Sequence, residues 1–340
     1  MALSTDAGNI QNEDNAASES ALLQVQGLTV SVNKDGNLYK IIDNIDFAIN
    51  EGEIAGLAGE SGCGKSMTAL SIPNLLPYGV SITEGKILYK NTNLCSLTEK
   101  EIRGVRGSEI SVIFQDVRQS LNPLMRIGSQ ITETLVLGGS KNKAANKKTA
   151  LDMLDSLGFD KPEKIFNGFA HQMSGGMCQR IMTAIAVIRR PKLLLADEPS
   201  SSLDEESQER CLSLLREMNV KNKMSLLIIS HDLSIIHKFS NRYFVMYSGK
   251  IMEEGPSDGL FSPLHPYTQA LIKAMPHKDK KGNALENIPG RIPSVEDKET
   301  ITGCPFAPRC GKAKDICRQV FPQAKIMGGR KVYCYFPGDA

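Results

Sequence analysis

A glycine-rich loop near the start of the chain limits the fold more than any other feature of the sequence. It follows an apolar run at residues 54–58, precedes a helix-like segment from about residue 65, and reads Gly59-Glu60-Ser61-Gly62-Cys63-Gly64-Lys65-Ser66. This spacing fits the pattern G-x-x-x-x-G-K-S/T, in which backbone N–H groups and the start of a helix surround a polyphosphate. In that design Lys65 reaches the β- and γ-phosphates and the Ser66 hydroxyl ligates Mg²⁺. The loop therefore predicts a nucleoside triphosphate site at the end of a buried strand.

The surrounding sequence favours an α/β fold with a parallel sheet. Apolar runs of strand length alternate with segments of helical periodicity, the runs at 54–58, 192–196 and 225–229 and the helices at 177–189 and 205–218. Buried strands that alternate with helices are typical of parallel sheets. Residues 22–30 and 41–49 instead predict two antiparallel strands of a half-buried sheet. We expect a phosphate-loop fold with an antiparallel β subdomain and a helical insert at about 115–175.

Two carboxylates, Asp197 and Glu198, follow the apolar run at 192–196. A carboxylate at the end of a buried strand is the usual partner of Mg²⁺ in phosphate-loop enzymes. Since neighbouring side chains of a strand point to opposite sides, we expect Asp197 to face the metal and Glu198 to face an attacking water as general base. The pair predicts hydrolysis of the bound triphosphate.

A second glycine pair stands before the helix predicted at 177–189, in Ser174-Gly175-Gly176. Such a helix start is another phosphate-binding design, here without a lysine of its own. A chain with two phosphate-binding elements and one magnesium site predicts a head-to-tail dimer. In this dimer each Ser-Gly-Gly covers the nucleotide held by the facing subunit.

Six elements together resemble those of ABC-type ATPases in order and approximate spacing, over about residues 22–255. They are the loop at 59–66, Gln115, Ser174-Gly175-Gly176, Asp197-Glu198, Ser202-Leu203-Asp204 and Ser230-His231-Asp232. The resemblance implies that the nucleotide is ATP and that Gln115 contacts Mg²⁺, water and the transmembrane subunits. It further implies that Asp204 lies on a loop communicating across the dimer, and that His231 is catalytic through its contact with the γ-phosphate.

The last part of the chain resembles the C-terminal extension of oligopeptide/dipeptide-permease ATPase subunits, and nickel importers share its front part. The matching segments are His265-Pro266-Tyr267-Thr268-Gln269-Ala270-Leu271, Ile288-Pro289-Gly290-Arg291-Ile292-Pro293 and Gly303-Cys304-Pro305-Phe306-Ala307-Pro308-Arg309-Cys310. Frequent prolines favour an extension that is held together by something other than a large core. We divide the chain into a disordered tail (1–20), an ATPase domain (21–262) and this extension (263–340).

Four of the eight cysteines crowd into the extension: Cys304, Cys310, Cys317 and Cys334. In a reducing cytosol such a cluster indicates a metal or iron–sulfur site rather than disulfides. Four thiolates suit either a tetrahedral zinc or a [4Fe–4S] cluster. Zinc is disfavoured because the spacing C-x5-C-x6-C-x16-C lacks a tight pair, and some members of the resembling family hold a cluster there. We predict a structural [4Fe–4S] cluster, with zinc or reduced thiols as the alternatives.

The composition bears on partners and location. Forty Lys and Arg against 38 Asp and Glu leave a net charge of +2, which gives no support to nucleic-acid binding. No segment has the composition of a membrane span or a signal peptide. We expect a peripheral protein at the cytoplasmic face of the cell membrane, bound to two transmembrane permease subunits. A second ABC ATPase subunit, identical or paralogous, would complete the dimer, and an extracytoplasmic solute-binding protein would act indirectly.

The leading functional hypothesis is the energy-coupling ATPase of an importer for dipeptides or oligopeptides. One alternative is a nickel or metal-chelate importer of the same family. Another is a soluble ABC ATPase acting on ribosomes or DNA, but those proteins typically carry two cassettes or a long coiled coil. This chain has one cassette and no heptads.

Overall fold

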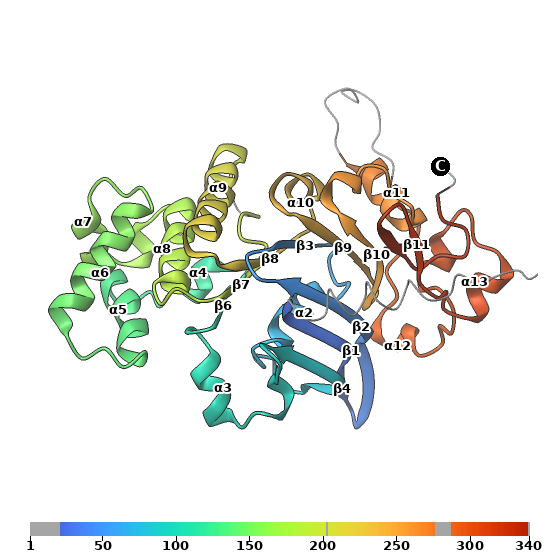
Figure 1. The fold of residues 1–340 in the computed structure, drawn as a ribbon, viewed down its shortest axis with the longest axis horizontal. Helices are drawn as coiled ribbons and strands as arrows, with labels where there is room; N and C mark the ends of the chain where they lie inside the picture. Colours follow the sequence, from blue (N-terminus) through green and yellow to red (C-terminus); the bar gives the residue numbers. More distant parts are fainter. Residues whose placement is uncertain (1–20, 202, 276–286, 339–340) are drawn as a thin grey trace, which may run out of the picture.

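An eight-stranded sheet forms the centre of the protein, in the order β11-β12-β10-β9-β3-β8-β7-β6 (Figure 1). The computed structural model describes residues 21–201, 203–275 and 287–338, so the tail expected at 1–20 lies outside it. Five strands run parallel: β3 (Ile54–Ala58), β6 (Ile110–Ile113), β7 (Leu193–Asp197), β8 (Ser225–Ser230) and β9 (Arg242–Tyr247). Every residue of β3, β7 and β8 is buried, which confirms the three predicted buried strands.

The sheet separates two apolar cores. Along β7, Leu193 and Leu195 pack into one core while Leu194 and Ala196 pack into the other, because neighbouring side chains of a strand point to opposite faces. The first core lies between this sheet and a second, antiparallel sheet, and the other contains residues of the helices on the opposite face. Because the five strands run parallel, their carboxyl ends lie along the same side of the sheet.

The second sheet has the order β2-β1-β4-β5. Its strands are β1 (Ala21–Lys34), β2 (Asn37–Asn50), β4 (Val80–Tyr89) and β5 (Thr92–Asn93). The antiparallel pair predicted at 22–30 and 41–49 is confirmed as β1 and β2, each longer than predicted. A two-residue turn joins them, in which Asp35 and Gly36 both have positive φ, 53° and 84°. An Asp-Gly pair suits such a turn, so both strands continue up to it.

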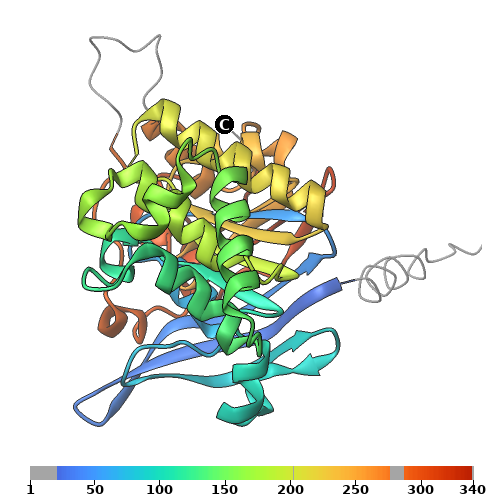
Figure 2. The same ribbon diagram turned by 90° about the vertical axis from the view of Figure 1, so that its left-hand side faces the viewer.

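The chain between β6 and β7 is helical, and these helices face the viewer in Figure 2. They are α4 (Val117–Ser120), α5 (Ile127–Leu137), α6 (Lys143–Ser156), α7 (Pro162–Asn167), η2 (Ala170–Gln172) and α8 (Gly175–Val187). The other helices up to residue 275 are α2 (Lys65–Ser71), η1 (Leu94–Ser96), α3 (Glu99–Val105), α9 (Glu205–Asn222), α10 (Leu233–Phe239), η3 (Ser257–Gly259) and α11 (Pro266–Ala274). Within the described residues, no helix combines the length and the apolar character needed to cross a membrane.

The C-terminal extension packs onto the central sheet more closely than the sequence predicts. Its elements after α11 are α12 (Val295–Lys298), η5 (Ala307–Arg309), α13 (Asp315–Gln319), β11 (Lys325–Met327) and β12 (Arg330–Val332). Strand β12 pairs with β10 (Lys250–Pro256) and so widens the central sheet. Phe306 is 2% exposed, and its ring lies 5.3 Å from that of Tyr247 and 5.2 Å from that of Tyr267. The expectation that this segment lacks a large core was wrong, because its apolar residues share the core of the cassette.

Candidate active site

The glycine-rich loop connects β3 to α2, as predicted. Gly59, Gly62 and Gly64 all have positive φ, at 152°, 80° and 113°. At Gly59 the need for glycine is also steric, because a Cβ atom there would lie 2.2 Å from the carbonyl oxygen of Met246. The neighbouring strand β9 therefore leaves no room for a side chain at the start of the loop.

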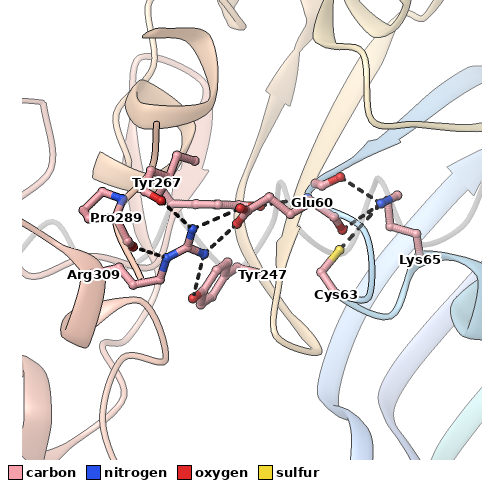
Figure 3. A network of polar contacts seen from close by, with 9 residues as sticks. Glu60, Cys63, Lys65, Tyr247, Tyr267, Pro289 and Arg309 are labelled. Atoms are coloured by element: carbon pink, nitrogen blue, oxygen red, sulfur yellow. Dashed lines mark hydrogen bonds and ion pairs between the residues drawn. The ribbon is translucent and has the colours of Figure 1, made fainter. Parts of the chain in front are cut away.

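Lys65 is 5% exposed and lies inside the loop. Its Nζ donates hydrogen bonds to the carbonyl oxygens of Gly59, at 2.8 Å, and Glu60, at 2.9 Å (Figure 3). These carbonyls satisfy an ammonium group that would otherwise be buried without partners. Polyphosphate oxygens are stronger acceptors because they are charged, so a bound nucleotide can draw Lys65 from the carbonyls to itself.

Asp197 ends strand β7 and lies within reach of Ser66 at the start of α2. Asp197 is 6% exposed as a residue, and burial raises the pKa of its carboxyl group, while a hydrogen bond from Ser66 and the charge of Lys65 act in the opposite direction. Its Oδ1 atom has no hydrogen-bond partner among the described residues. A buried carboxylate oxygen without a partner, next to a hydroxyl, suits a hard divalent cation with oxygen ligands. These residues therefore fit Mg²⁺.

Glu198 occupies an unusual backbone conformation for a residue that is not glycine, with φ 46°. Because β7 ends at Asp197, the expected strand alternation does not extend to Glu198, and the left-handed turn orients it instead. Its Oε1 lies 3.2 Å from Nδ1 of His231, and its Oε2 accepts a hydrogen bond of 3.2 Å from Nε2 of Gln115. Conformations of this kind cost about 1–3 kcal/mol and cluster at functional sites.

The residues of this edge follow different strands. Gln115 follows β6, His231 follows β8, and Glu198 follows β7, which lies between them in the sheet. Parallel strands bring their carboxyl ends to one edge, which is where open α/β sheets bind ligands. The structure thus brings together four of the six sequence-derived elements: the loop at 59–66, Gln115, the pair Asp197-Glu198, and the segment that contains His231.

Ser174, Gly175 and Gly176 lie elsewhere, on a second surface. Ser174 caps α8, accepting a hydrogen bond of 3.3 Å from the N–H of Met177. A Cβ atom built at Gly175 would meet no described atom within 4 Å, so this helix start is open. Together with Asp204 these residues line a cavity of about 690 Å³, to which no residue of the loop at 59–66 contributes.

Asp204 caps helix α9 on the same surface. Its carboxylate accepts hydrogen bonds from the N–H of Ser207, at 2.9 Å, and from the hydroxyl of Ser207, at 2.8 Å. These bonds lower the pKa of Asp204. Ser202, at the start of this motif, lies outside the described residues.

All four cysteines of the extension line one small cavity, whose other walls include Phe306, Ala307 and Phe336. Burial, together with the nearby thiols of the other three cysteines, raises the pKa of Cys304 to about 12, against the opposite effect of a backbone hydrogen bond at Phe306. The described residues contain no group of three or more His, Cys, Asp or Glu side chains arranged to hold a single metal ion. The four cysteines therefore line one cavity, but no three of them are arranged around a single ion among the described residues.

The contact between the extension and the loop was not predicted from the sequence. Arg309 forms a bidentate ion pair with Glu60, and the N–H of Glu60 donates to the hydroxyl of Tyr267 (Figure 3). Both segments were recognised as motifs. Nothing in their spacing indicated that residues 249 positions apart would meet.

Comparisons with known proteins agree with this geometry. Residues 42–201 match the ABC transporter family, and residues 252–317 match the family described as the C-terminal region of oligopeptide/dipeptide transporters. The chain is 40% identical to the dipeptide transport ATP-binding protein DppD of Haemophilus influenzae over 318 residues, 93% of this chain and 96% of that protein. It is also 40% identical to the oligopeptide transport ATP-binding protein AppD of Bacillus subtilis over 319 residues, 93% of this chain and 97% of that protein.

A solved structure supports the fold. The post-hydrolysis state of the ATP-binding cassette MJ0796, dimeric and bound to ADP and Pi, is similar with a TM-score of 0.63 and 25% identity. The similarity covers 69% of this chain and 98% of that chain. The phosphate loop, the strand-end carboxylates and both matching families lead to the same conclusion. This chain belongs to the ATP-hydrolysing ABC transporter proteins that carry the oligopeptide/dipeptide transporter C-terminal region.

Proposed function

We propose that this protein is the energy-coupling ATPase subunit of an importer for dipeptides or oligopeptides. The observation that carries the proposal is the placement of Glu198 between Gln115 and His231, beside the buried Asp197, at the edge that also holds the phosphate loop. The relatives named for dipeptide and oligopeptide transport support the substrate class, because the similarity extends through the C-terminal extension.

Each site residue receives a role from its position. Lys65 moves from the carbonyls of Gly59 and Glu60 to the β- and γ-phosphates of ATP. Ser66 and Asp197, with Gln115, would hold Mg²⁺, which would supply neutralisation of the charge on the phosphates. Asp197 is suited to this because its buried Oδ1 has no partner among the described residues.

Glu198 accepts the proton of the attacking water as general base. Gln115 and His231 hold the two oxygens of its carboxylate, and this fixes the direction of the carboxylate toward the water. His231 has a side chain that is 57% exposed, so its ring is free to contact the γ-phosphate once a nucleotide is present.

A second subunit completes the site. Ser174, Gly175 and Gly176 form an open helix start on a different surface from the loop, so they serve a nucleotide that another subunit binds. Asp204 lies beside them and links the two sites. The partner is an identical copy or a paralogue, and the dimeric state of MJ0796 supports the arrangement.

The membrane subunits lie outside this chain. We propose that the helical segment at about 115–175 contacts two transmembrane permease subunits and that Gln115 transmits the state of the nucleotide to it. This places the protein at the cytoplasmic face of the membrane, where an extracytoplasmic solute-binding protein delivers peptide from the opposite side.

We also propose that Cys304, Cys310, Cys317 and Cys334 hold a [4Fe–4S] cluster. A single zinc ion would draw its four sulfurs to within about 4 Å of each other, since each Zn–S bond is about 2.3 Å. The arrangement around a shared apolar cavity suits a cube whose irons each take one thiolate at a separate corner. When bound, the cluster would supply structural cross-linking of the extension.

The test of the transport function is reconstitution in vesicles with the permease subunits, the second ATP-binding subunit and the solute-binding protein. Peptide-dependent ATP hydrolysis and uptake of labelled dipeptide are expected, and Ni²⁺ or a nickel chelate should not stimulate either. Stimulation by nickel without any response to peptides would contradict the assignment.

A further inference from the structure

One arginine of the C-terminal extension, Arg309, donates hydrogen bonds from its whole guanidinium group to the phosphate loop and to segments beside it. Arg309 has a side chain that is 5% exposed. Its Nη1 and Nη2 donate to the two carboxylate oxygens of Glu60 at 2.8 and 3.0 Å. Its other donors reach the hydroxyl of Tyr247 at 3.3 Å and the carbonyls of Pro289, at 2.7 Å, and Ile288, at 3.2 Å. All five N–H donors of the guanidinium group therefore have acceptors.

Glu60, the second residue of the loop, is held from two further sides (Figure 3). Its N–H donates to the hydroxyl of Tyr267 at 2.9 Å, and Tyr267 is fully buried on α11. Its carbonyl oxygen accepts a hydrogen bond from Nζ of Lys65. One residue thus joins the extension directly to the lysine of the loop.

The ion pair between Arg309 and Glu60 affects nucleotide binding through the negative charge of the Glu60 carboxylate. A carboxylate in the loop repels the phosphates of ATP, and the repulsion strengthens where water is excluded. The bidentate pair neutralises that carboxylate and, because two parallel bonds fix its plane, also fixes its direction. With Arg309 removed, Glu60 would carry an unpaired charge in a partly buried position close to Lys65.

We propose that Arg309 is a positioning residue for ATP: by holding Glu60, it keeps the loop open to polyphosphate and sets the affinity for MgATP. The inference rests on the proposed placement of the phosphates at residues 59–66. Arg309 stays on protein acceptors, because its main partner is the charged carboxylate of Glu60, whereas Lys65 is held only by neutral carbonyls. Arg309 also directly precedes Cys310, so the cysteine cavity and the phosphate loop are joined through one short segment.

The experiment compares MgATP binding by the full chain, measured through displacement of a fluorescent ATP analogue, with thermal unfolding of the same samples. Arg309→Met should raise the Kd about 10-fold or more, a change of about 1.4 kcal/mol. Arg309→Lys should lie in between, because it keeps the charge but not the bidentate geometry. The matched control is Arg291→Met, since the Arg291 side chain is 85% exposed in the same extension, and its Kd should stay at the wild-type value.

A purely structural ion pair predicts a different outcome, in which unfolding temperature falls while the Kd of the folded protein is unchanged. That result would overturn the inference. In a Glu60→Gln background, Arg309→Met should change the Kd less than about twofold, because the charge to be neutralised is gone. Equal effects in both backgrounds would also overturn it. Should Arg309→Met not fold, Arg309→Lys decides, and a wild-type Kd for that variant counts against the proposal.

Lys65→Ala separates this inference from the proposed nucleotide site. Loss of binding in Lys65→Ala together with wild-type binding in Arg309→Met rejects the role of Arg309 alone. Wild-type binding in Lys65→Ala rejects the placement of the phosphates, and with it the basis of the inference.

Discussion

Nδ1 of His231 lies 3.2 Å from Oε1 of Glu198, although the two residues stand 33 positions apart in the chain. The contact exists because β7 and β8 run side by side in parallel, so the residues that follow them meet. A backbone hydrogen bond from the N–H of Glu198 to the carbonyl of Ile229, at the end of β8, fixes the distance between the two turns. The proposed base is therefore oriented by the sheet itself.

Glu198→Gln should abolish steady-state ATP hydrolysis while MgATP binding remains close to wild type. The amide keeps the shape of the carboxylate and its contact with Gln115 but cannot accept a proton, so we expect a loss of about 100-fold or more. Phosphate release and analogue displacement measure the two quantities. Glu209→Gln is the control, because that side chain is 58% exposed and pairs with Lys238 away from the site. A variant at Glu198 that hydrolyses ATP at the wild-type rate would refute the assignment of the base.

Asp197→Asn should stabilise the nucleotide-free protein at neutral pH. Burial raises the pKa of Asp197 above its ordinary value of 3.8, although the hydrogen bond from Ser66 and the charge of Lys65 act to lower it. The carboxyl group of Asp197 therefore binds its proton more tightly in the folded state than in the unfolded state. Stability therefore falls as the pH rises from 3.8 through the raised pKa, and the loss is fully present above it.

The substitution removes this loss, which raises the Tm by roughly 2–4 °C for each kcal/mol recovered. Thermal unfolding across pH measures the effect, and the gain should vanish at pH values below 3.8. Mg²⁺ should stabilise the wild type more than the variant. Asp204→Asn is the control and should bring no gain, because hydrogen bonds from Ser207 lower its pKa. A lower Tm for Asp197→Asn at neutral pH would contradict the prediction.

The sequence predicted those parts of the fold that depend on local pattern. Strands β3, β7 and β8 were found because each is a continuous aliphatic run, which is how strands covered on both faces appear. The β11–β12 hairpin was missed, because each of its strands has three residues and is held by pairing with β10 rather than by its own periodicity.

The site also contains features that local sequence pattern predicts and features that depend on tertiary packing. The loop and Asp197 follow from spacing along the chain, and the sequence predicted the loop between β3 and α2 and Asp197 at the end of β7. The left-handed backbone of Glu198 and the contact between Arg309 and Glu60 arise only from tertiary packing. No local signal in the sequence encodes either of them.

Ser174→Arg should separate nucleotide binding from hydrolysis. Ser174 lies on a different surface from the loop of its own chain, so the isolated variant should bind MgATP with a Kd within about twofold of wild type. In the assembled transporter the bulky cation should block the nucleotide site of the facing subunit and lower hydrolysis at least about 10-fold. Loss of binding by the isolated chain would show that Ser174 serves its own loop, contrary to the composite site.

The cysteine cavity gives the last prediction. Protein purified without oxygen should be brown, with broad absorbance at about 400 nm and about four irons per chain, because four cysteines line one apolar cavity and each would ligate one iron as its thiolate. Cys304→Ser should remove most of the absorbance and lower the Tm, since the cluster would tie the extension together. Cys95→Ser is the matched control: Cys95 is exposed in η1, lies outside the cavity, and should leave the absorbance unchanged. Colourless protein with one zinc per chain, or with no metal under anaerobic handling, would contradict the proposed cluster. An equal loss of absorbance in Cys304→Ser and Cys95→Ser would show that the absorbance does not arise from this cavity.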